Sequence, residues 1–240
     1  FQNGADGKDR VGPARMVQSG SISPKQMKRG LYVSGAIAFS LGILLLNEVF
    51  VVKRNWMGFS LYLGVGVLAI WAAFRYTAGK NPYGYKGLGD LFVFLFFGIV
   101  SVLSMSYFLS GSVGTFAVLN TIIVGMLSVA VLHLNNLRDH ISDAKAGKRT
   151  LVVKLGFQKG KYLHFVWLGL AFVAAVVEVV LSPSHYAFYM LPFLILVVHA
   201  KKVYSCTNPQ FLDSELKKVA LSTFAIALLL LIFLPRSEEH

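Results

Sequence analysis

One segment of the chain, NNLRDHISDAKAGKRTLVVKLG at residues 135–156, concentrates acids, amides and cations directly after a long apolar run. Asn135, Asp139 and Asp143 are spaced four apart, so on a helix each step rotates by only roughly 40° and the three side chains project from one face. A carboxylate pair placed in this way can hold a divalent cation. The spacing also fits a solvated helix end whose acids pair with Arg138 or Lys145.

The groups around these acids favour a metal site. Two adjacent amides, Asn135 and Asn136, belong to the same short segment. The nearby cations are Arg138, Lys145, Lys148 and Arg149. Magnesium in proteins is usually held by one or two carboxylates together with phosphate oxygens of a substrate, and cations then balance the remaining phosphate charge. We therefore expect Asp139 and Asp143 to bind Mg²⁺ that bridges to a phosphate.

The elements that would position these side chains are membrane helices. The chain of 240 residues is 55% hydrophobic and only 14% charged, which is outside the range of soluble domains. Continuous apolar runs, rather than alternating ones, exclude a membrane β-barrel. Seven windows are long enough to cross a bilayer: 31–50, 56–75, 90–110, 113–134, 162–181, 185–203 and 218–235. The sequence predicts an all-α, multi-span transmembrane helix bundle.

The distribution of Lys and Arg predicts the orientation of these spans. Of the 23 cations, 20 lie in one alternating set of segments, namely 1–30, 75–86, 138–161 and 201–218. Because positively charged loops remain in the cytoplasm, we expect the segment beginning at Phe1 to be cytoplasmic and the C-terminus to lie on the opposite face. A nucleic-acid partner is excluded despite the net charge of +12, since such binding requires the cations on one soluble face.

A second polar cluster lies near the start of the chain. The stretch GADGKDRVGPARMVQSGSISP, residues 4–24, places Asp6 and Asp9 three apart, followed by Arg10 and Arg15. Alone, it fits a Gly-rich connecting loop. Two acid-and-base clusters on one membrane face, however, indicate a diphosphate held between two metal-bearing segments, with apolar helices below it.

A diphosphate ester whose other end belongs in lipid is most simply a polyprenyl diphosphate. Magnesium and Arg or Lys would stabilise the leaving diphosphate, an allylic cation would form, and an acceptor would capture it. The loop TAGKNPYGYKGLGD, residues 77–90, could supply Tyr83, Tyr85 and Lys86 to this site. Aromatic faces stabilise cations, although tyrosines at a membrane boundary also serve as interfacial anchors.

These segments resemble a known family. NNLRDHISDAKAGKRTLVVKLG is similar to the second aspartate motif of the UbiA superfamily of intramembrane prenyltransferases. It follows almost throughout the pattern NNxRDxxxDxxxGKxTLxxxLG of the 1,4-dihydroxy-2-naphthoate prenyltransferases of menaquinone biosynthesis. NGADGKDRVGPARMVQSGSIS resembles the end of their first motif and its DRVGPxR element, and YTAGKNPYGYKGLGDLFVFLFFG resembles their loop and fifth span. The resemblance covers essentially the whole chain.

The resemblance implies a longer bundle than the seven spans. The family's first motif begins with further acids ahead of the position of Phe1, and two spans normally precede it, so nine helices are expected in a complete chain. The start at Phe1, without an initiator Met, is read as that of a fragment. Residues 1–240 are accordingly expected to form a single UbiA-type domain that lacks its first two spans.

The resemblance also assigns roles to residues of this chain. Asp139 and Asp143 would bind one Mg²⁺, and Asp6 would belong to the group that binds the other. The expected contacts of the diphosphate and substrate are Arg10, Asn135, Asn136, Arg138, Lys148, Lys86 and Tyr85. In the family reaction the prenyl chain replaces the ring carboxylate of 1,4-dihydroxy-2-naphthoate, carbon dioxide is lost, and demethylmenaquinol forms. The implied location is the bacterial inner membrane, with the site on the cytoplasmic side and the prenyl tail in a groove open to membrane lipid.

Two other functions are considered beside this one. Another UbiA-type enzyme would keep the fold and the metal chemistry but prenylate a different aromatic acceptor such as 4-hydroxybenzoate; DRVGPAR and NNLRD favour the naphthoate enzymes. A cation-coupled transporter would place ionisable residues near the bilayer midplane and break helices there. Here most acids lie outside the spans or at their cytoplasmic ends, which argues against transport.

Overall fold

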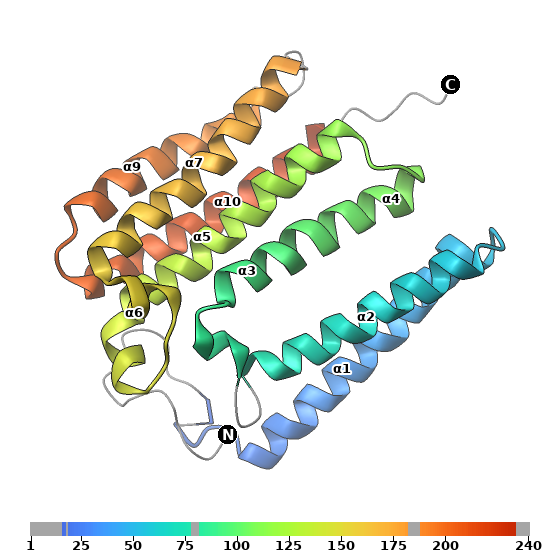
Figure 1. Ribbon diagram of the computed structural model, residues 1–240, viewed down its shortest axis with the longest axis horizontal. Coiled ribbons are helices and arrows are strands. Elements are labelled where there is room, and N and C mark those ends of the chain that lie inside the picture. The colour runs from blue at the N-terminus through green and yellow to red at the C-terminus, as the bar shows by residue number, and fades with distance from the viewer. Residues whose placement is uncertain (1–15, 18, 78–81, 182–187, 234–240) are drawn as a thin grey trace. The chain divides into compact units, whose positions relative to one another are not determined.

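The computed structural model describes residues 16, 17, 19–77, 82–181 and 188–233, and every regular element in these ranges is a helix (Figure 1). Among the described residues, those up to Tyr85 form one compact unit and those from Lys86 onward form a second. The predicted all-α fold is confirmed.

The first unit is a hairpin of two long helices, α1 (Pro24–Leu46) and α2 (Trp56–Thr77). Ser23 starts α1 with a capping box, in which its Oγ accepts from the backbone N of Gln26 (3.2 Å) and Gln26 Oε1 accepts from the backbone N of Ser23 (2.9 Å). A π-helical turn, Asn47–Val51, continues α1 into the connection to α2.

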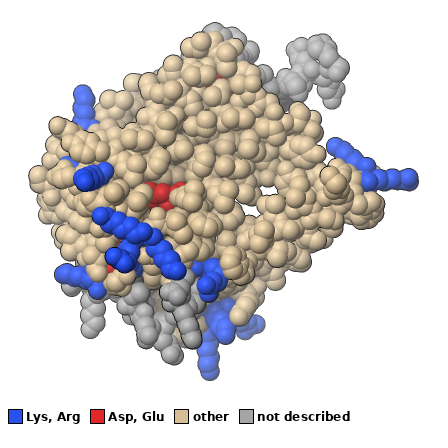
Figure 2. Space-filling view, viewed as in Figure 1, with Lys and Arg blue, Asp and Glu red and all other residues tan. Residues whose placement is uncertain are grey.

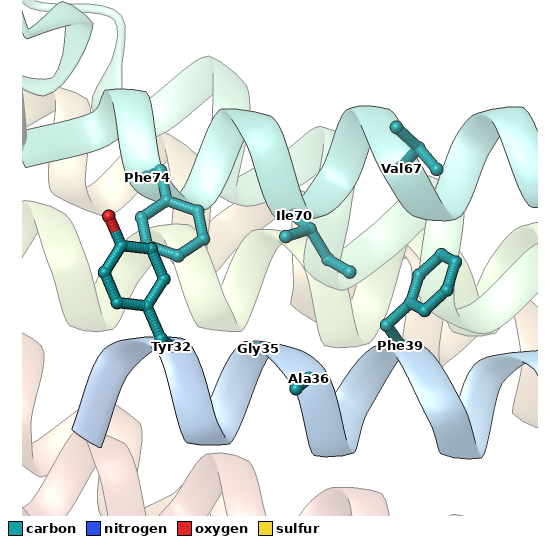
Figure 3. A pocket seen from close by; sticks show the side chains of 7 residues that line it. All are labelled: Tyr32, Gly35, Ala36, Phe39, Val67, Ile70 and Phe74. Carbon is teal, nitrogen blue, oxygen red and sulfur yellow. The ribbon is translucent and has the colours of Figure 1, made fainter. Parts of the chain in front are cut away.

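An apolar groove of about 260 Å³ opens between α1 and α2 (Figure 3). It is lined by Tyr32, Gly35, Ala36, Phe39, Val67, Ile70 and Phe74. Many large apolar side chains of these two helices are exposed, among them Leu41, Leu44 and Leu61. Such surfaces are stable in contact with lipid rather than water.

The second unit is organised around α5 (Thr115–Lys145), a helix of 31 residues. It packs against α7 (Phe157–Leu181), α10 (Asp213–Phe233) and the short α6 (Leu151–Leu155). It also packs against a broken helix, which consists of α3 (Gly89–Val93), a π-helical segment (Phe94–Leu103) and α4 (Ser104–Ser110). The remaining helix, α9 (Leu191–Ser205), packs against α7 and α10. The buried core of this unit is therefore centred on one face of α5, which includes Ile123, Leu127, Ala130 and Leu134.

Glycine allows the broken helix to approach α5 closely. A Cβ added at Gly125 would lie 2.7 Å from the Phe94 ring, which is shorter than real Cβ contacts, and 3.0 Å from the Cα of Gly98, which is tighter than most of them. Small residues at such crossings let two backbones come together, which is a common way for helices to associate in membranes.

Six described helical segments are long and apolar enough to cross a membrane. They are 24–51, 56–76, 89–110, 115–145, 157–181 and 188–205. These segments fall on the first six predicted spans. The seventh predicted span, 218–235, falls on α10, which is not one of the six segments. The first turns of α10 carry four charged residues, Asp213, Glu215, Lys217 and Lys218. Residues 234 and 235 lie outside the described part of the chain. The protein is thus an integral, multi-span membrane protein.

Candidate active site at the end of α5

The last turns of α5 and the turn that follows carry the predicted site residues. α5 ends in a Schellman motif: the backbone N of Lys148 donates to Asp143 O (2.9 Å) and the backbone N of Gly147 donates to Ala144 O (3.1 Å). Gly147 has φ +75°, a left-handed conformation that glycine adopts without a steric penalty. The sequence DAKAGK therefore folds Lys148 back over the helix end and places it beside Asp143.

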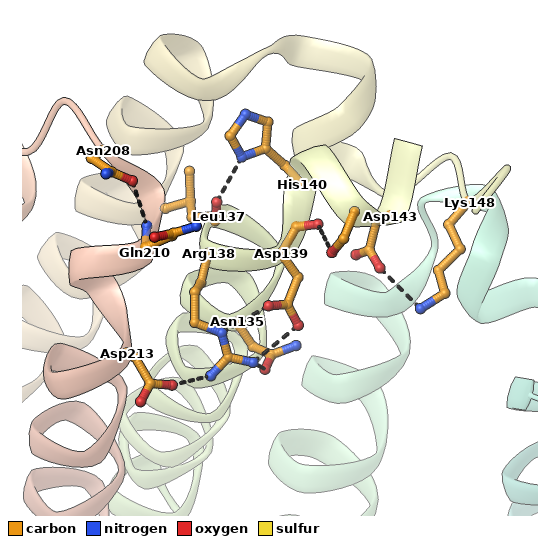
Figure 4. Close-up of polar contacts among 11 residues, drawn as sticks. Asn135, Leu137, Arg138, Asp139, His140, Asp143, Lys148, Asn208, Gln210 and Asp213 are labelled. Atoms are coloured by element: carbon orange, nitrogen blue, oxygen red, sulfur yellow. Dashed lines mark hydrogen bonds and ion pairs between the residues drawn. The ribbon is translucent and has the colours of Figure 1, made fainter. Parts of the chain in front are cut away.

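Asp143 and Lys148 form a buried ion pair. Lys148 Nζ donates to Asp143 Oδ1 at 2.9 Å, and each side chain is only 9% exposed. Figure 4 shows the lysine reaching across from the loop after α5 to the carboxylate on the helix. A salt-bridged acid was one of the two sequence-based interpretations; its partner is Lys148, and not the exposed Lys145, because the glycine turn reverses the chain direction.

Asp139 is held by Arg138 in a two-point contact. Arg138 Nε donates to Asp139 Oδ1 (2.8 Å) and Nη2 donates to Oδ2 (3.0 Å). The same guanidinium donates from Nη2 to Asn135 Oδ1 (2.8 Å) and from Nη1 to Asp213 Oδ1 (2.7 Å). Asp213 is the first residue of α10, so this arginine joins the ends of two helices (Figure 4).

We call these six residues, Asn135, Arg138, Asp139, Asp143, Lys148 and Asp213, the α5 cluster. It contains three carboxylates and two cations. Arg138, Asp139, Asp143 and Lys148 are all less than a tenth exposed, whereas the side chain of Asp213 is 51% exposed. Burial of so many charges is stable only because each is paired and hydrogen-bonded.

The donor set of the α5 cluster fits a magnesium ion. Asp139 and Asp143 lie one helical turn apart and supply hard carboxylate oxygens, and magnesium needs only one or two of these when phosphate oxygens complete its coordination. Within the described residues no group of three or more acids, histidines or cysteines is arranged to hold a metal by itself. The arrangement is therefore suited to a metal that arrives with a phosphate, with Arg138 and Lys148 nearby to share the phosphate charge.

Exposed cations surround the buried acids. Figure 2 shows many Lys and Arg side chains and little Asp or Glu around the region where α6 lies in Figure 1. Lys145, Arg149, Lys154 and Lys159 are at least partly exposed, whereas Asp139 and Asp143 are 3% and 6% exposed. This end of the second unit therefore presents positive charge at the surface and carboxylates beneath it, which favours the approach of an anion.

The structure places the other predicted residues as follows. Asn136 is buried on α5, one residue beyond Asn135. The backbone O of Lys86 accepts from Lys154 Nζ of α6 (2.5 Å), so Lys86 lies close to the segment that follows Lys148. Asp6 and Arg10 lie outside the described residues.

Two predicted tyrosines belong to the first unit. Tyr85 is half-buried in a helical turn, and its backbone N donates to Pro82 O (3.2 Å). Tyr83 donates its hydroxyl to Ala72 O (2.8 Å), and burial raises the pKa of Tyr83. The structure thus shows an anchoring role for Tyr83 within the hairpin, and a role of either tyrosine toward the α5 cluster stays a prediction.

Sequence reasoning missed Asp213 as a partner of this site. Asp213 and Glu215 stand in the first turn of α10, where acids are common because they oppose the positive end of the helix dipole. That ordinary explanation hid the contact with Arg138, which lies 75 residues earlier in the chain. The available signal was only that DSEL falls at the cation-rich end of its helix.

A second polar region of the second unit was also missed. His133 Nδ1 lies 2.5 Å from Asp90 Oδ2, and its Nε2 lies 3.0 Å from Gly160 O. His164 Nε2 lies 2.9 Å from His199 Nε2, and His199 Nδ1 lies 2.9 Å from Glu215 Oε2. We call the five side chains Asp90, His133, His164, His199 and Glu215 the histidine network; all are 6% exposed or less.

Comparison with known proteins identifies the family of this chain. Residues 5–211 match the UbiA prenyltransferase family. This match crosses the boundary between the two units. The chain therefore belongs to the UbiA prenyltransferase family, a class of membrane-embedded helical enzymes.

The similar proteins include several enzymes named for one aromatic acceptor. The chain is 39% identical over 232 residues to 1,4-dihydroxy-2-naphthoate octaprenyltransferase of Haemophilus influenzae, which is 95% of this chain and 73% of that protein. It is 40% identical over 161 residues to the protein of the same name from Escherichia coli, covering 67% of this chain and about half, 51%, of that protein. UbiA prenyltransferase domain-containing protein 1 of Dictyostelium discoideum is 29% identical over 92% of this chain and 64% of that protein. No solved structure matches the chain.

These findings confirm the predicted resemblance. The family is the one expected from NNLRDHISD, and the H. influenzae and E. coli naphthoate enzymes have higher identity to this chain than the Dictyostelium protein. A transporter, the more distant alternative, is not supported by any of them. The chain is a UbiA-type prenyltransferase and is similar to enzymes named for 1,4-dihydroxy-2-naphthoate.

Proposed function

We propose that this protein transfers a polyprenyl chain from a polyprenyl diphosphate to 1,4-dihydroxy-2-naphthoate in a magnesium-dependent reaction that releases carbon dioxide and gives demethylmenaquinol. The observation that carries the proposal is the buried carboxylate pair of α5, Asp139 and Asp143, with a cation of the same segment on each. The names of the similar proteins from H. influenzae and E. coli supply the acceptor.

The donor's diphosphate would bind at the α5 cluster. Arg138 and Lys148 are already positioned there as donors, and on binding they would turn some of their hydrogen bonds from carboxylates to phosphate oxygens. Asn135 and Asn136 add amide donors, and Lys86 is close enough to α6 to approach the same anion. Arg10 and Tyr85 complete the proposed substrate contacts.

Asp139 and Asp143 would hold one Mg²⁺ ion, and Asp6 would help to hold another. When bound, magnesium supplies positive charge that stabilises the departing diphosphate. Arg138 and Lys148 add to that stabilisation from the protein side, because they neutralise charge as it develops on the leaving oxygen.

The chemistry then proceeds at carbon. The allylic C–O bond breaks and its electron pair leaves with the diphosphate, so that an allylic cation forms. The electron-rich ring of the naphthoate attacks this cation at the carbon that bears the carboxylate. Loss of carbon dioxide returns the electron pair of the broken C–C bond to the ring and restores aromaticity.

The membrane setting follows from the same proposal. The prenyl chain would lie among the apolar helices in contact with lipid, while both charged substrates meet the polar end of the second unit. We place that end on the cytoplasmic side of a bacterial inner membrane, in line with the concentration of Lys and Arg around it. We also propose that residues 1–240 act as part of one catalytic domain, since the family match crosses both units.

A product assay tests the proposal directly. The purified chain is placed in liposomes with magnesium and a long-chain prenyl diphosphate, and is offered either 1,4-dihydroxy-2-naphthoate or 4-hydroxybenzoate. Carbon dioxide release and a prenylated naphthoquinol with the first acceptor alone are expected. Turnover with 4-hydroxybenzoate alone would assign the protein to a different UbiA-type reaction, and the absence of turnover with either acceptor would contradict the proposal.

A further inference from the structure

Asp213 is the member of the α5 cluster that the sequence motif does not contain. It lies at the start of α10 and accepts from Arg138 Nη1 at 2.7 Å, the shortest of the arginine's four hydrogen bonds. Arg138 is 4% exposed and donates to three separate side chains, so its position is fixed from both helices. The contact therefore joins a half-exposed acid to a buried arginine whose position is fixed.

The effect of Asp213 on its neighbours is electrostatic. Arg138 is a cation on Asp139, and Asp213 accepts from the same guanidinium. The positive charge of Arg138 is therefore divided between two acids, so Asp213 reduces the share of it that neutralises Asp139. A divalent cation binds more tightly where its carboxylate ligands are less fully neutralised by other cations.

We propose that Asp213 is a positioning residue for the metal and diphosphate site. It anchors Arg138 and shares that residue's charge, so that Asp139 keeps enough negative charge to hold a divalent cation while Arg138 stays aimed at the diphosphate. Asp213 itself touches neither metal nor substrate in this proposal. The inference rests on the proposed function, because it assumes that Asp139 is a metal ligand.

The geometry also sets the size of the expected effect. The Asp213 side chain is 51% exposed, so solvent weakens its interaction with Arg138 compared with the fully buried contact to Asp139. Exposed ion pairs change equilibria roughly two- to fivefold. Asp213→Asn is expected to weaken divalent-cation binding by a factor in that range, and Asp213→Glu, which keeps the charge, is expected to recover most of the loss.

The test measures cation binding rather than turnover. Mn²⁺ binding to the full chain in detergent is followed by the loss of the free-ion electron paramagnetic resonance signal, with inorganic diphosphate present. Four proteins are compared: the unaltered chain, Asp213→Asn, Arg138→Gln and the double variant. If Asp213 acts through Arg138, Asp213→Asn has less than half its effect in the Arg138→Gln background.

Matched controls separate this role from a general loss of charge or of folding. Glu48→Gln removes one exposed acid from the first unit and is expected to leave Mn²⁺ affinity unchanged. Circular dichroism and a thermal melt establish that each variant remains helical. An equal effect of Asp213→Asn with and without Arg138, or no effect at all, would overturn the inference.

Failure of this inference can be distinguished from failure of the proposed function. Mn²⁺ binding does not require an acceptor, so the coupling between Asp213 and Arg138 can be present even if no naphthoate is prenylated. In active protein, the same substitution is expected to raise the apparent KM for Mg²⁺ roughly two- to fivefold while kcat at saturating Mg²⁺ changes less. A fall in kcat without a change in that KM would contradict the positioning role.

Discussion

The α5 cluster and the histidine network both consist of charged or polar side chains of the second unit, most of them buried, but they join different parts of the chain. Five of the six cluster residues come from positions 135–148, a single helix end and its turn. The histidine network instead takes Asp90 from α3, His133 from α5, His164 from α7, His199 from α9 and Glu215 from α10.

The two regions also differ in how their hydrogen bonds are used. In the histidine network the partners are imidazole ring nitrogens, a backbone carbonyl and single carboxylates, which link neighbouring helices. In the α5 cluster most of the contacts join an acidic to a basic side chain, and one member, Asp213, is half-exposed. This contrast suggests that the histidine network fixes the helices, whereas the α5 cluster can exchange its ion pairs for contacts with a ligand.

The largest effect is expected from Asp139→Asn. The amide keeps the shape of the side chain but removes the charge that would hold a divalent cation, so turnover is expected to fall by at least about 100-fold. The measurement is the rate of prenylated product formation in liposomes, with circular dichroism to check that the helices persist. If the Asp139→Asn variant retained near-normal turnover at the magnesium concentration used for the unaltered protein, the α5 cluster would be only a structural ion-pair network.

A smaller but position-specific loss is expected from Lys148→Met. This residue is held on Asp143 by the glycine turn and is proposed to contact diphosphate, so turnover is expected to fall roughly 10- to 100-fold. Lys145→Met is the matched control, because Lys145 is an exposed lysine three residues earlier, and it is expected to change turnover less than about twofold. Equal losses in the two variants would mean that general surface charge, and not the pairing with Asp143, supports the reaction.

The histidine network is expected to respond in stability rather than in chemistry. Asp90→Leu removes the carboxylate beside His133 Nδ1 and leaves a buried ring nitrogen without its partner, at a cost of about 1–2 kcal/mol in the free energy of unfolding. SDS titration of the protein in mixed micelles measures this change. The double variant Asp90→Leu with His133→Leu is expected to recover part of the loss, since it removes both polar groups; a further loss would show that the pair is not a unit.

The resemblance to a prenyltransferase and most of the α5 cluster were predictable from sequence because they are local. A spacing of four residues places Asn135, Asp139 and Asp143 on one helix face, and AGK after a helix predicts a glycine-terminated end. The apolar windows likewise predicted the helices, since a span must satisfy its backbone hydrogen bonds internally. The sequence offered Arg138 or Lys145 as partners of these acids. Arg138 does hold Asp139, but the lysine on Asp143 is Lys148, because spacing along a helix cannot show how the chain reverses after it.

Sequence alone therefore determined that this protein is an α-helical membrane protein with an acid-and-base segment of UbiA type, since composition, hydrophobic length and helical spacing depend only on neighbouring residues. The contacts of Asp213 with Arg138, 75 residues apart, and of His133 with Asp90, 43 residues apart, arise from helix packing in three dimensions. No regular spacing in the sequence predicts such pairs, because the packing of separate helices around α5 sets which side chains face each other. The same packing decides which of the chain's buried charges fix the fold and which are in a position to bind a ligand.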